Sequence, residues 1–365
     1  MRLVRGLIRF VIIIIFIGCI GVEAYLHGAF DFVEKLDKVT SMEELTEYIN
    51  EELRRDINQF DIYVENVTEE QIKNVNRNLD GFFGNVTTYT ILGQKRDGML
   101  KVRLKVLASE NLEVWKLLVE GKNDVALSEK GQKLYDQVST ILHNEIQEGM
   151  TDFEKEKALH DYLIKNCAFE ENYKGGDRTG DEDYYKAYGA LVNHKAVCNG
   201  YAEAMNLLLN AAGISCKMVV GTADGTDHAW NVVKLEDGWY QVDATWDDPT
   251  PDREGMVQYD YFNLTDEQMA KSHQWNREDY EACTETKYNY FIYYNQVCSS
   301  YEEYKQKVNQ AIAKKKKKIV YLVTEYEKGT YDLSFVVDSH LNIKKASYMT
   351  SDSPMGTIIS LNVTY

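Results

Sequence analysis

Apolar residues recur at helical spacing near the start of the chain, at Met42, Leu45, Ile49, Leu53 and Ile57. This pattern predicts a helix over residues 41–56. A short run rich in β-branched and aromatic residues follows at 61–65 and predicts a strand. Two further runs, 87–92 and 100–107, alternate polar and apolar residues around an Arg-Asp-Gly turn and predict a hairpin. The order helix, strand, hairpin describes a small α/β module.

The C-terminal part of the chain repeats this plan. Residues 300–313 align with the segment that begins at Ser41, and a strand at 320–322 then matches the one at 62–64. Each copy ends in two strands, and the sequence from Met99 onward resembles the sequence from Met355 onward. We interpret the two segments as a duplicated module that flanks a central domain. Chance similarity between amphipathic helices is the alternative.

Residues 1–24 have the features of a targeting signal rather than of a folded domain. Three arginines precede an apolar run over 10–22, and Val22-Glu23-Ala24 resembles the small-x-small pattern before a signal-peptidase cut. The run is shorter than the roughly 20 residues that span a bilayer as a helix. A cleaved export signal is our first interpretation. An uncleaved membrane anchor is the second, and both place the remaining chain outside the cytoplasm.

The length of the chain indicates how many domains it has, and its net charge indicates which partners it can bind. A chain of 365 residues is expected to form two or three domains. We predict an N-terminal module over 25–129, a central domain over 130–297 and a C-terminal module over 298–365. The net charge of −17 argues against nucleic acid as a partner, because phosphate binding relies on clustered lysine and arginine. Any contact with a membrane is expected only through residues 1–24, if they are not cleaved.

Cys198 is the first candidate for chemistry. Downstream apolar residues at helical spacing, and Gly213 after them, predict a helix that begins near this cysteine. A thiol in the first turn of a helix lies at the positive end of the helix dipole, which lowers its pKa and favours the thiolate. The unpaired backbone N–H groups of the same turn are able to hold a developing oxyanion.

His228 and Asp243 lie on the two strands of a predicted hairpin. An imidazole can accept the thiol proton and later protonate a leaving group, and a carboxylate beyond it stabilises the imidazolium. A two-residue turn at Asp237-Gly238, however, would place Asp243 opposite Val232, four residues from His228. At about 3.4 Å per residue that separation is too large for a hydrogen bond. Strand twist, a bulge or a wider loop must therefore close the gap if the three residues act together.

Each residue taken singly has an ordinary structural explanation, as a buried cysteine, a strand histidine or a turn aspartate. Their order is much less expected by chance. Cys198, His228-Ala229-Trp230 and Val242-Asp243-Ala244-Thr245 resemble the core motifs of the transglutaminase-like superfamily. Segments 187–191, 246–249 and 261–263 also resemble its exported bacterial branch, so that the resemblance covers about residues 130–295.

The resemblance implies an α+β, papain-like core with a cysteine at a helix start packed on an antiparallel sheet. It implies that Cys198 is the nucleophile, His228 the general base and acid, and Asp243 the residue that orients His228. The superfamily includes cross-linking enzymes, amidases, peptidases and inactive members, so the resemblance does not select one reaction. The animal enzymes' calcium sites are not recognisable here, and we expect neither a metal nor another cofactor.

Other residues near these motifs have less certain roles. The candidates for the substrate channel or the oxyanion site, each of which could equally belong to the core, are Tyr188, Asn199, Trp230 and Trp246. His273 could approach the site, but we favour a structural role for it. Three acidic residues, Asp247, Asp248 and Asp252, lack the spacing of a metal-ligand loop, and we interpret them as a solvated acidic loop.

Together these features predict an exported or membrane-anchored thiol acyl-transfer enzyme that acts on amides of a protein or cell-wall peptide. An amine acceptor would give cross-linking, and water would give deamidation or proteolysis. The acidic segments 177–183 and 247–254 would favour a cationic acceptor such as a lysine amine. A plain cysteine peptidase is one alternative. A non-catalytic cell-surface binding or scaffold protein that retains the fold is the other.

Overall fold

The computed structural model describes residues 37–73, 75, 84–94, 98–173, 182–249, 256–327, 329, 331, 334–338 and 342–365. The chain divides into two compact units, one of residues 1–78 and 86–107 and the other of residues 79–85 and 108–365. The predicted export signal, the tip of the first hairpin and most of the glycine-rich loop before Cys198 lie outside the described residues. Within the described part, none of the helices has both the length and the apolar composition needed to cross a bilayer.

The first unit places helix α2 (Met42–Arg54) beside a four-stranded sheet with the order β1-β2-β4-β3. Its other elements are β1 (Lys38–Val39), β2 (Gln59–Val64), α3 (Glu69–Lys73), β3 (Gly84–Gln94) and β4 (Leu100–Ala108). Ser41 caps α2 by accepting a hydrogen bond from the backbone N–H of Glu44 at 3.1 Å. The helix and hairpin predicted for this segment are therefore present, and the predicted strand begins two residues earlier, at Gln59.

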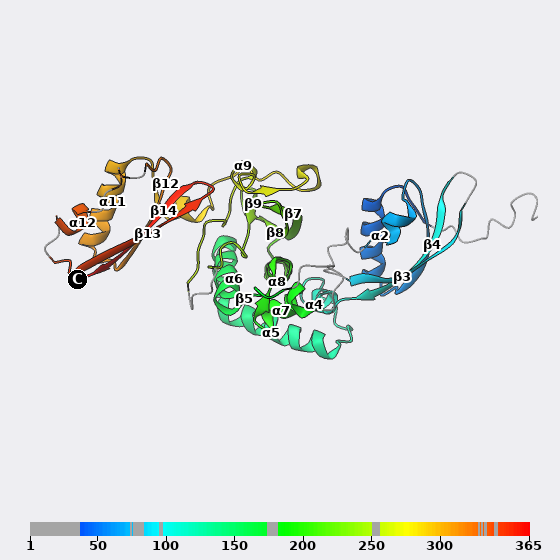
Figure 1. Ribbon diagram of the computed structural model, residues 1–365. Helices are drawn as coiled ribbons and strands as arrows, with labels where there is room; N and C mark the ends of the chain where they lie inside the picture. Colours follow the sequence, from blue (N-terminus) through cyan, green and yellow to red (C-terminus); the bar gives the residue numbers. More distant parts are fainter. Residues whose placement is uncertain are drawn as a thin grey trace, which may run out of the picture. The chain divides into compact units, whose positions relative to one another are not determined.

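The second unit begins with helices (Figure 1). They are α4 (Glu110–Leu118), α5 (Glu129–Glu145), α6 (Asp152–Asn166), α7 (Ala187–Leu191) and α8 (Cys198–Ala211). Short strands β5 (Ala168–Phe169) and β6 (Lys195–Ala196) pair in parallel between them. Ten consecutive residues of α8, from Gly200 to Leu209, are buried. Helix α8 is thus the central helix of this unit, and only its two ends are left near the surface.

A four-stranded antiparallel sheet with the order β10-β7-β8-β9 packs on α8. Its strands are β7 (Cys216–Ala223), β8 (Thr226–Lys234), β9 (Trp239–Val242) and β10 (His273–Gln274). The amide of Asn231 in β8 donates to the carbonyl of Ala202 in α8 at 3.0 Å, which fixes the sheet against the helix. Short helices α9 (Asp266–Met269) and α10 (Tyr290–Tyr293) and the 3-10 turns η2 (Asp183–Tyr185) and η3 (Arg277–Asp279) complete this part.

The last elements of the second unit form a small helix-and-sheet layer of their own. Helix α11 (Tyr301–Ala313), capped by Ser300, buries Tyr304, Val308, Ala311 and Ile312 against a sheet with the order β11-β12-β14-β13. The remaining elements are β11 (Val297–Cys298), β12 (Lys318–Val323), α12 (Ser334–Asp338), β13 (Lys345–Ser353) and β14 (Gly356–Thr364).

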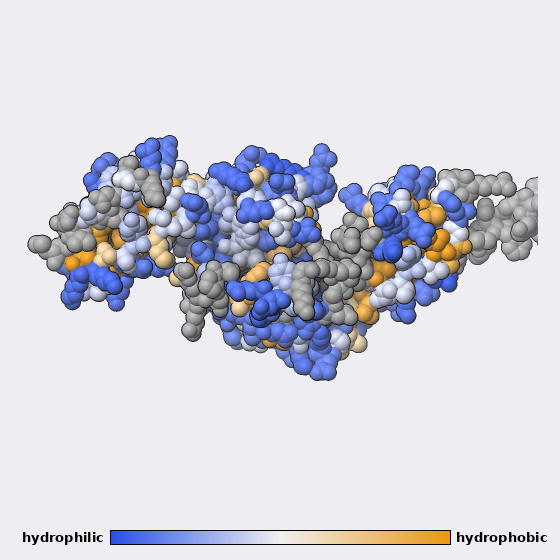
Figure 2. Space-filling view, in the orientation of Figure 1, coloured by the Kyte–Doolittle hydropathy of each residue, from blue (hydrophilic) through white to orange (hydrophobic). Residues whose placement is uncertain are grey.

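This C-terminal sheet has the same order of elements as the sheet of the first unit. In both sheets the two-residue first strand pairs in parallel with the second strand, which pairs antiparallel with the last strand of the hairpin. The duplication inferred from the sequence remains a prediction about the origin of the two modules. The helical part of the second unit shows a mainly hydrophilic face in Figure 2.

Candidate active site

Cys198 is the first residue of α8, as its place in the sequence predicts. No side chain caps this helix, so the N–H groups of its first turn are not used by a cap. The other cysteines among the described residues, Cys167, Cys216, Cys283 and Cys298, are buried, whereas Cys198 is partly exposed. None of these five described cysteines is in a disulfide, and Cys198 is the one among them that a solute can reach.

The segment before α8 is held tightly against its first turn. The backbone N–H of Val197 donates to the carbonyl of Tyr184 at 2.9 Å, and a Cβ on Gly200 would lie only 2.7 Å from the same oxygen. The amide of Asn199 donates to the carbonyl of Tyr185 at 2.6 Å and to Glu203 at 3.1 Å. These contacts fix where the thiol of Cys198 lies.

His228 is the third residue of β8 and is 6% exposed. Its Nε2 lies 2.7 Å from Oδ2 of Asp243, which leaves Nδ1 for Cys198, its other hydrogen-bond partner. Burial alone would lower the pKa of His228, but the charge and hydrogen bond of Asp243, together with Cys198, raise it to about 10. The imidazole is therefore held as an imidazolium at neutral pH.

The hairpin that joins His228 to Asp243 turns one residue earlier than the sequence suggested. Leu235 N–H donates to the carbonyl of Gly238 at 2.9 Å, so Glu236 and Asp237 form the turn. Strand β9 consequently pairs with β8 in a register shifted by two residues, with Asn231 opposite Val242. This register places Asp243 beside Trp230, two residues from His228 on the same face. The hydrogen bond forms without a bulge.

Asp243 is fully buried and accepts four hydrogen bonds. The backbone N–H groups of Thr245 and Trp246 donate to Oδ1 at 2.9 and 3.2 Å. The imidazoles of His228 and His273 both reach Oδ2, at 2.7 and 3.1 Å. Burial would raise the pKa of this carboxyl, but the two histidines hold the pKa well below its usual range. Asp243 is therefore an anion that supports the imidazolium of His228.

A cavity of about 720 Å³ opens over these residues. Cys198 and His228 line it, together with Phe169, Tyr173 and Tyr185. Asp224, from the turn between β7 and β8, and Asp227, the second residue of β8, also line it. The cavity is large enough for one amino-acid side chain and its flanking backbone.

The four secondary candidates occupy different surroundings. Asn199 and Trp246 line the cavity, and Trp246 also packs against His228 and His273 with ring centroids 5.8 and 4.6 Å apart. Trp230 is 1% exposed and donates to Gln241 at 2.7 Å. Tyr188 is buried in α7, with the ammonium of Lys130 5.1 Å from its ring centre. The roles suggested for these residues stay predictions.

His273, for which the sequence favoured a structural role over an approach to the site, lies at the centre of the site. Its side chain joins Asp243 to Ser272, whose hydroxyl is 2.8 Å from Nδ1. The ligand atoms of His228, Asp243 and His273 lie within 4.8 Å of one another, a grouping that could also hold a metal ion. We assign these atoms to the hydrogen-bond chain, because both Nε2 atoms already meet the carboxylate at hydrogen-bond distance and the thiol of Cys198 adjoins His228.

Part of the second unit is similar to known proteins. Residues 140–244 match the family model of the Transglutaminase-like superfamily. This segment is a transglutaminase-like domain. The match includes Cys198, His228 and Asp243 and ends before His273. The α+β class and the transglutaminase-like core predicted from the sequence are confirmed.

Several proteins are similar to the transglutaminase-like domain. Human kyphoscoliosis peptidase is 29% identical over 113 residues, which are 28% of this chain and 17% of that protein. The chain therefore spans less than a fifth of this relative's length. A solved structure of a TGase is 14% identical with a TM-score of 0.26, over 52% of this chain and 51% of that chain. The periplasmic domain of TgpA from Pseudomonas aeruginosa is 19% identical with a TM-score of 0.24, over 40% and 54%.

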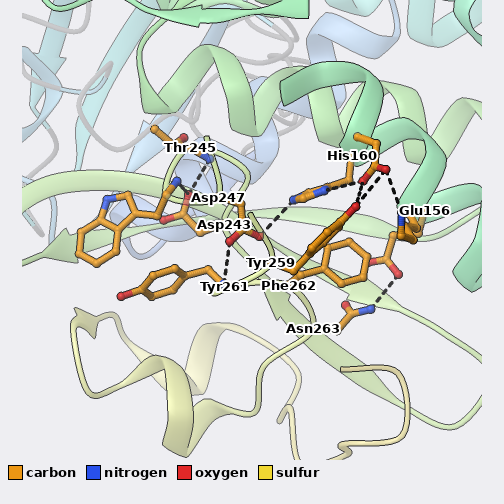
Figure 3. A network of polar contacts seen from close by, with 12 residues as sticks. Glu156, His160, Asp243, Thr245, Asp247, Tyr259, Tyr261, Phe262 and Asn263 are labelled. Carbon is orange, nitrogen blue, oxygen red and sulfur yellow. Dashed lines mark hydrogen bonds and ion pairs between the residues drawn. The ribbon is translucent and has the colours of Figure 1, made fainter. Parts of the chain in front are cut away.

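The acidic residues after Asp243 are not the solvated loop that the sequence suggested. Asp247 is fully buried: Oδ2 lies 3.1 Å from Nε2 of His160 in α6, and Oδ1 accepts the backbone N–H of Tyr261 at 2.8 Å (Figure 3). Asp248 is 5% exposed and accepts the hydroxyl of Tyr201. Asp252 lies outside the described residues. The expectation for Asp247 and Asp248 was wrong because buried partners on two helices hold both carboxylates.

His160, in α6, connects this turn to the helical part of the unit. It is fully buried, and its Nδ1 lies 3.6 Å from Asp161. Burial would lower the pKa of His160, but Asp161 and Asp247 raise it to about 9. Beside it, Asn263 donates to Glu156 at 2.9 Å (Figure 3). These buried contacts hold the segment that follows Asp243 and so help to fix the carboxylate.

Proposed function

We propose that the chain is an extracytoplasmic thiol acyl-transfer enzyme that acts on protein or peptide amides through Cys198, His228 and Asp243. The observation that carries the proposal is the partly exposed Cys198 at a helix start, beside His228, whose Nε2 lies 2.7 Å from the buried carboxylate of Asp243. A thiolate next to an imidazolium is the reactive form of a cysteine nucleophile. Export is supported by the features of residues 1–24.

In the first step the Cys198 thiolate attacks the carbonyl carbon of an amide and forms a carbon–sulfur bond. The first-turn N–H groups of α8 are available to the oxyanion. The carbon–nitrogen bond then breaks, and His228 gives its proton to the leaving nitrogen. A thioester on Cys198 and a neutral His228 result, while Asp243 remains an anion.

In the second step an amine or water attacks the thioester, and His228 takes its proton. The carbon–sulfur bond breaks and the thiolate returns beside the imidazolium. An amine gives a new amide, and water gives a carboxylic acid. The carboxylates of Asp224 and Asp227 in the cavity support a cationic acceptor such as a lysine amine. Asp247 and Asp248, which the sequence suggested for this role, are buried.

A cysteine peptidase is the second candidate. The similarity to kyphoscoliosis peptidase favours it, although the likeness covers 17% of that protein. The two reactions share the first step and differ only in the group that resolves the thioester. A scaffold protein without catalysis would need none of the three residues.

The test measures the rate at which iodoacetamide alkylates Cys198 as a function of pH, with peptide mapping of the labelled site. Fast labelling at pH 6 that is lost in His228→Ala would establish the thiolate–imidazolium pair, because free cysteine titrates near pH 8.5. Labelling that rises only above pH 8 and is unchanged in His228→Ala would refute the proposed enzymatic function. Glutamine peptides with cationic and neutral amines would then separate amine transfer from hydrolysis.

A further inference from the structure

His273 reaches the carboxylate of Asp243 from the far edge of the sheet. It lies on β10, opposite Ala223 of β7, and it is 1% exposed. At the level of the two histidines, the same face of β7 carries Ala223 and Gly221, and Gly221 is opposite His228. A Cβ on Gly221 would lie 2.2 Å from the carbonyl of Gln274. Small residues on β7 thus leave room for two imidazoles to converge.

The protons of this cluster can be assigned from its donors and acceptors. Asp243 is an anion and only accepts, so each imidazole must present an N–H at Nε2. The hydroxyl of Ser272 lies 2.8 Å from Nδ1 of His273 and is the hydrogen-bond partner of that second ring nitrogen. Oδ2 is therefore one acceptor atom shared by two N–H donors, at 2.7 Å from His228 and 3.1 Å from His273.

We propose that His273 is a positioning residue of the active site. Its Nε2–H donates to Oδ2 of Asp243 and so weakens the hydrogen bond that the same oxygen accepts from His228. The inference rests on the proposed function of Cys198 and His228. A carboxylate that serves two donors binds each less strongly than a carboxylate that serves one. His273 would thus keep His228 charged without holding its proton too tightly for transfer to a leaving group.

Two variants separate this role from simple packing. The ring of His273 packs against Trp230 and Trp246, with centroids 4.9 and 4.6 Å apart. His273→Phe keeps a ring there but removes the N–H. His273→Gln loses the ring but can place an amide N–H near the original Nε2. A packing role predicts that Phe behaves like the native residue and Gln does not, and a positioning role predicts the reverse.

The experiment is proton NMR of the full chain at pH 7, on the low-field resonance of the His228 Nε2–H. Without the competing donor, the His228–Asp243 hydrogen bond strengthens. We expect the resonance to move further downfield in His273→Phe and to return to its native position in His273→Gln. No movement in His273→Phe, or the same movement in both variants, would overturn the proposal.

A measurement on the native chain covers the case in which a variant does not fold. Nitrogen-15 shifts of His273 should show a proton on Nε2, and an unprotonated Nε2 would also overturn the inference. Alkylation of Cys198 at pH 6 tests the proposed function separately. Slow alkylation in the native chain would reject the enzyme, even where the NMR results support the contact between His273 and Asp243.

Discussion

Replacement of Asp243 by asparagine is the sharpest test of how this site keeps His228 charged. The substitution preserves the shape of the side chain and removes its charge. The native carboxylate accepts two backbone N–H groups at Oδ1 and two imidazoles at Oδ2. An asparagine amide has one oxygen, so it can accept on only one of these sides.

The size of the effect follows from the pKa of His228. That pKa lies at about 10, against an ordinary value of 6.5, and the difference of about 3.5 units corresponds to about 5 kcal/mol. Asp243 contributes the largest part of the rise, and burial of a side chain that is 6% exposed acts against it. Without the carboxylate, burial remains and favours the neutral imidazole. We therefore expect His228 to be uncharged at pH 7 in Asp243→Asn.

Alkylation of Cys198 by iodoacetamide at pH 6 measures the consequence. Loss of the imidazolium should reduce the rate by about a hundredfold or more, since the thiolate is the reacting form. Asp237→Asn is the matched control, because Asp237 lies in the turn of the same hairpin and accepts only the hydroxyl of Tyr240. Labelling of Asp243→Asn within threefold of the native rate, in a chain that melts normally, would refute this account of the charge.

Three further predictions concern stability and metal. The raised pKa of His228 contributes stability that is present below about pH 6.5 and is lost as the pH rises towards 10. The unfolding free energy should therefore fall over that range by at most about 1.4 kcal/mol per pH unit from this group. Urea titrations of His228→Gln should show a shallower fall with pH, and an unchanged slope would contradict the assignment. Gly221→Ala should destabilise the chain by about 1–3 kcal/mol, because its Cβ would press on the carbonyl of Gln274, whereas Gly93→Ala, with no atom within 4 Å, should be nearly neutral in the same assay. Treatment with EDTA should leave the alkylation rate at pH 6 unchanged, and a purified chain that holds one equivalent of metal and loses reactivity with it would show that His228, Asp243 and His273 bind a metal.

Elements with a strong local signal could be predicted from the sequence. The start of α8 at Cys198 follows from the apolar spacing after it and from Gly213, whose φ of 84° suits the end of a helix. The helices capped by Ser41 and Ser300 were predicted from similar patterns. In each case neighbours within a few residues determine the structure.

Features that depend on distant residues could not be predicted in the same way. The turn at Glu236 and Asp237 was placed one residue late, because Asp-Gly is a strong hairpin signal and the register is set by the burial of β8 and β9. The sequence could only favour a structural role for His273 over an approach to the site, because the residue meets Asp243 across 30 residues of sequence and from the opposite edge strand of the sheet. The burial of Asp247 depends on His160, 87 residues away.

Helix α4 limits how this domain can be exchanged between proteins. Asn111, at the start of α4, donates to the buried carboxylate of Glu203 at 2.7 Å, and the backbone N–H of Ala187 donates to the same oxygen at 2.9 Å. Glu203 lies on the helix that carries Cys198. A gene fusion that moved only residues 140–244 would leave Glu203 without Asn111. A transferred segment that keeps both of these hydrogen bonds to Glu203 must therefore include residue 111, which lies upstream of the region that matches the family model.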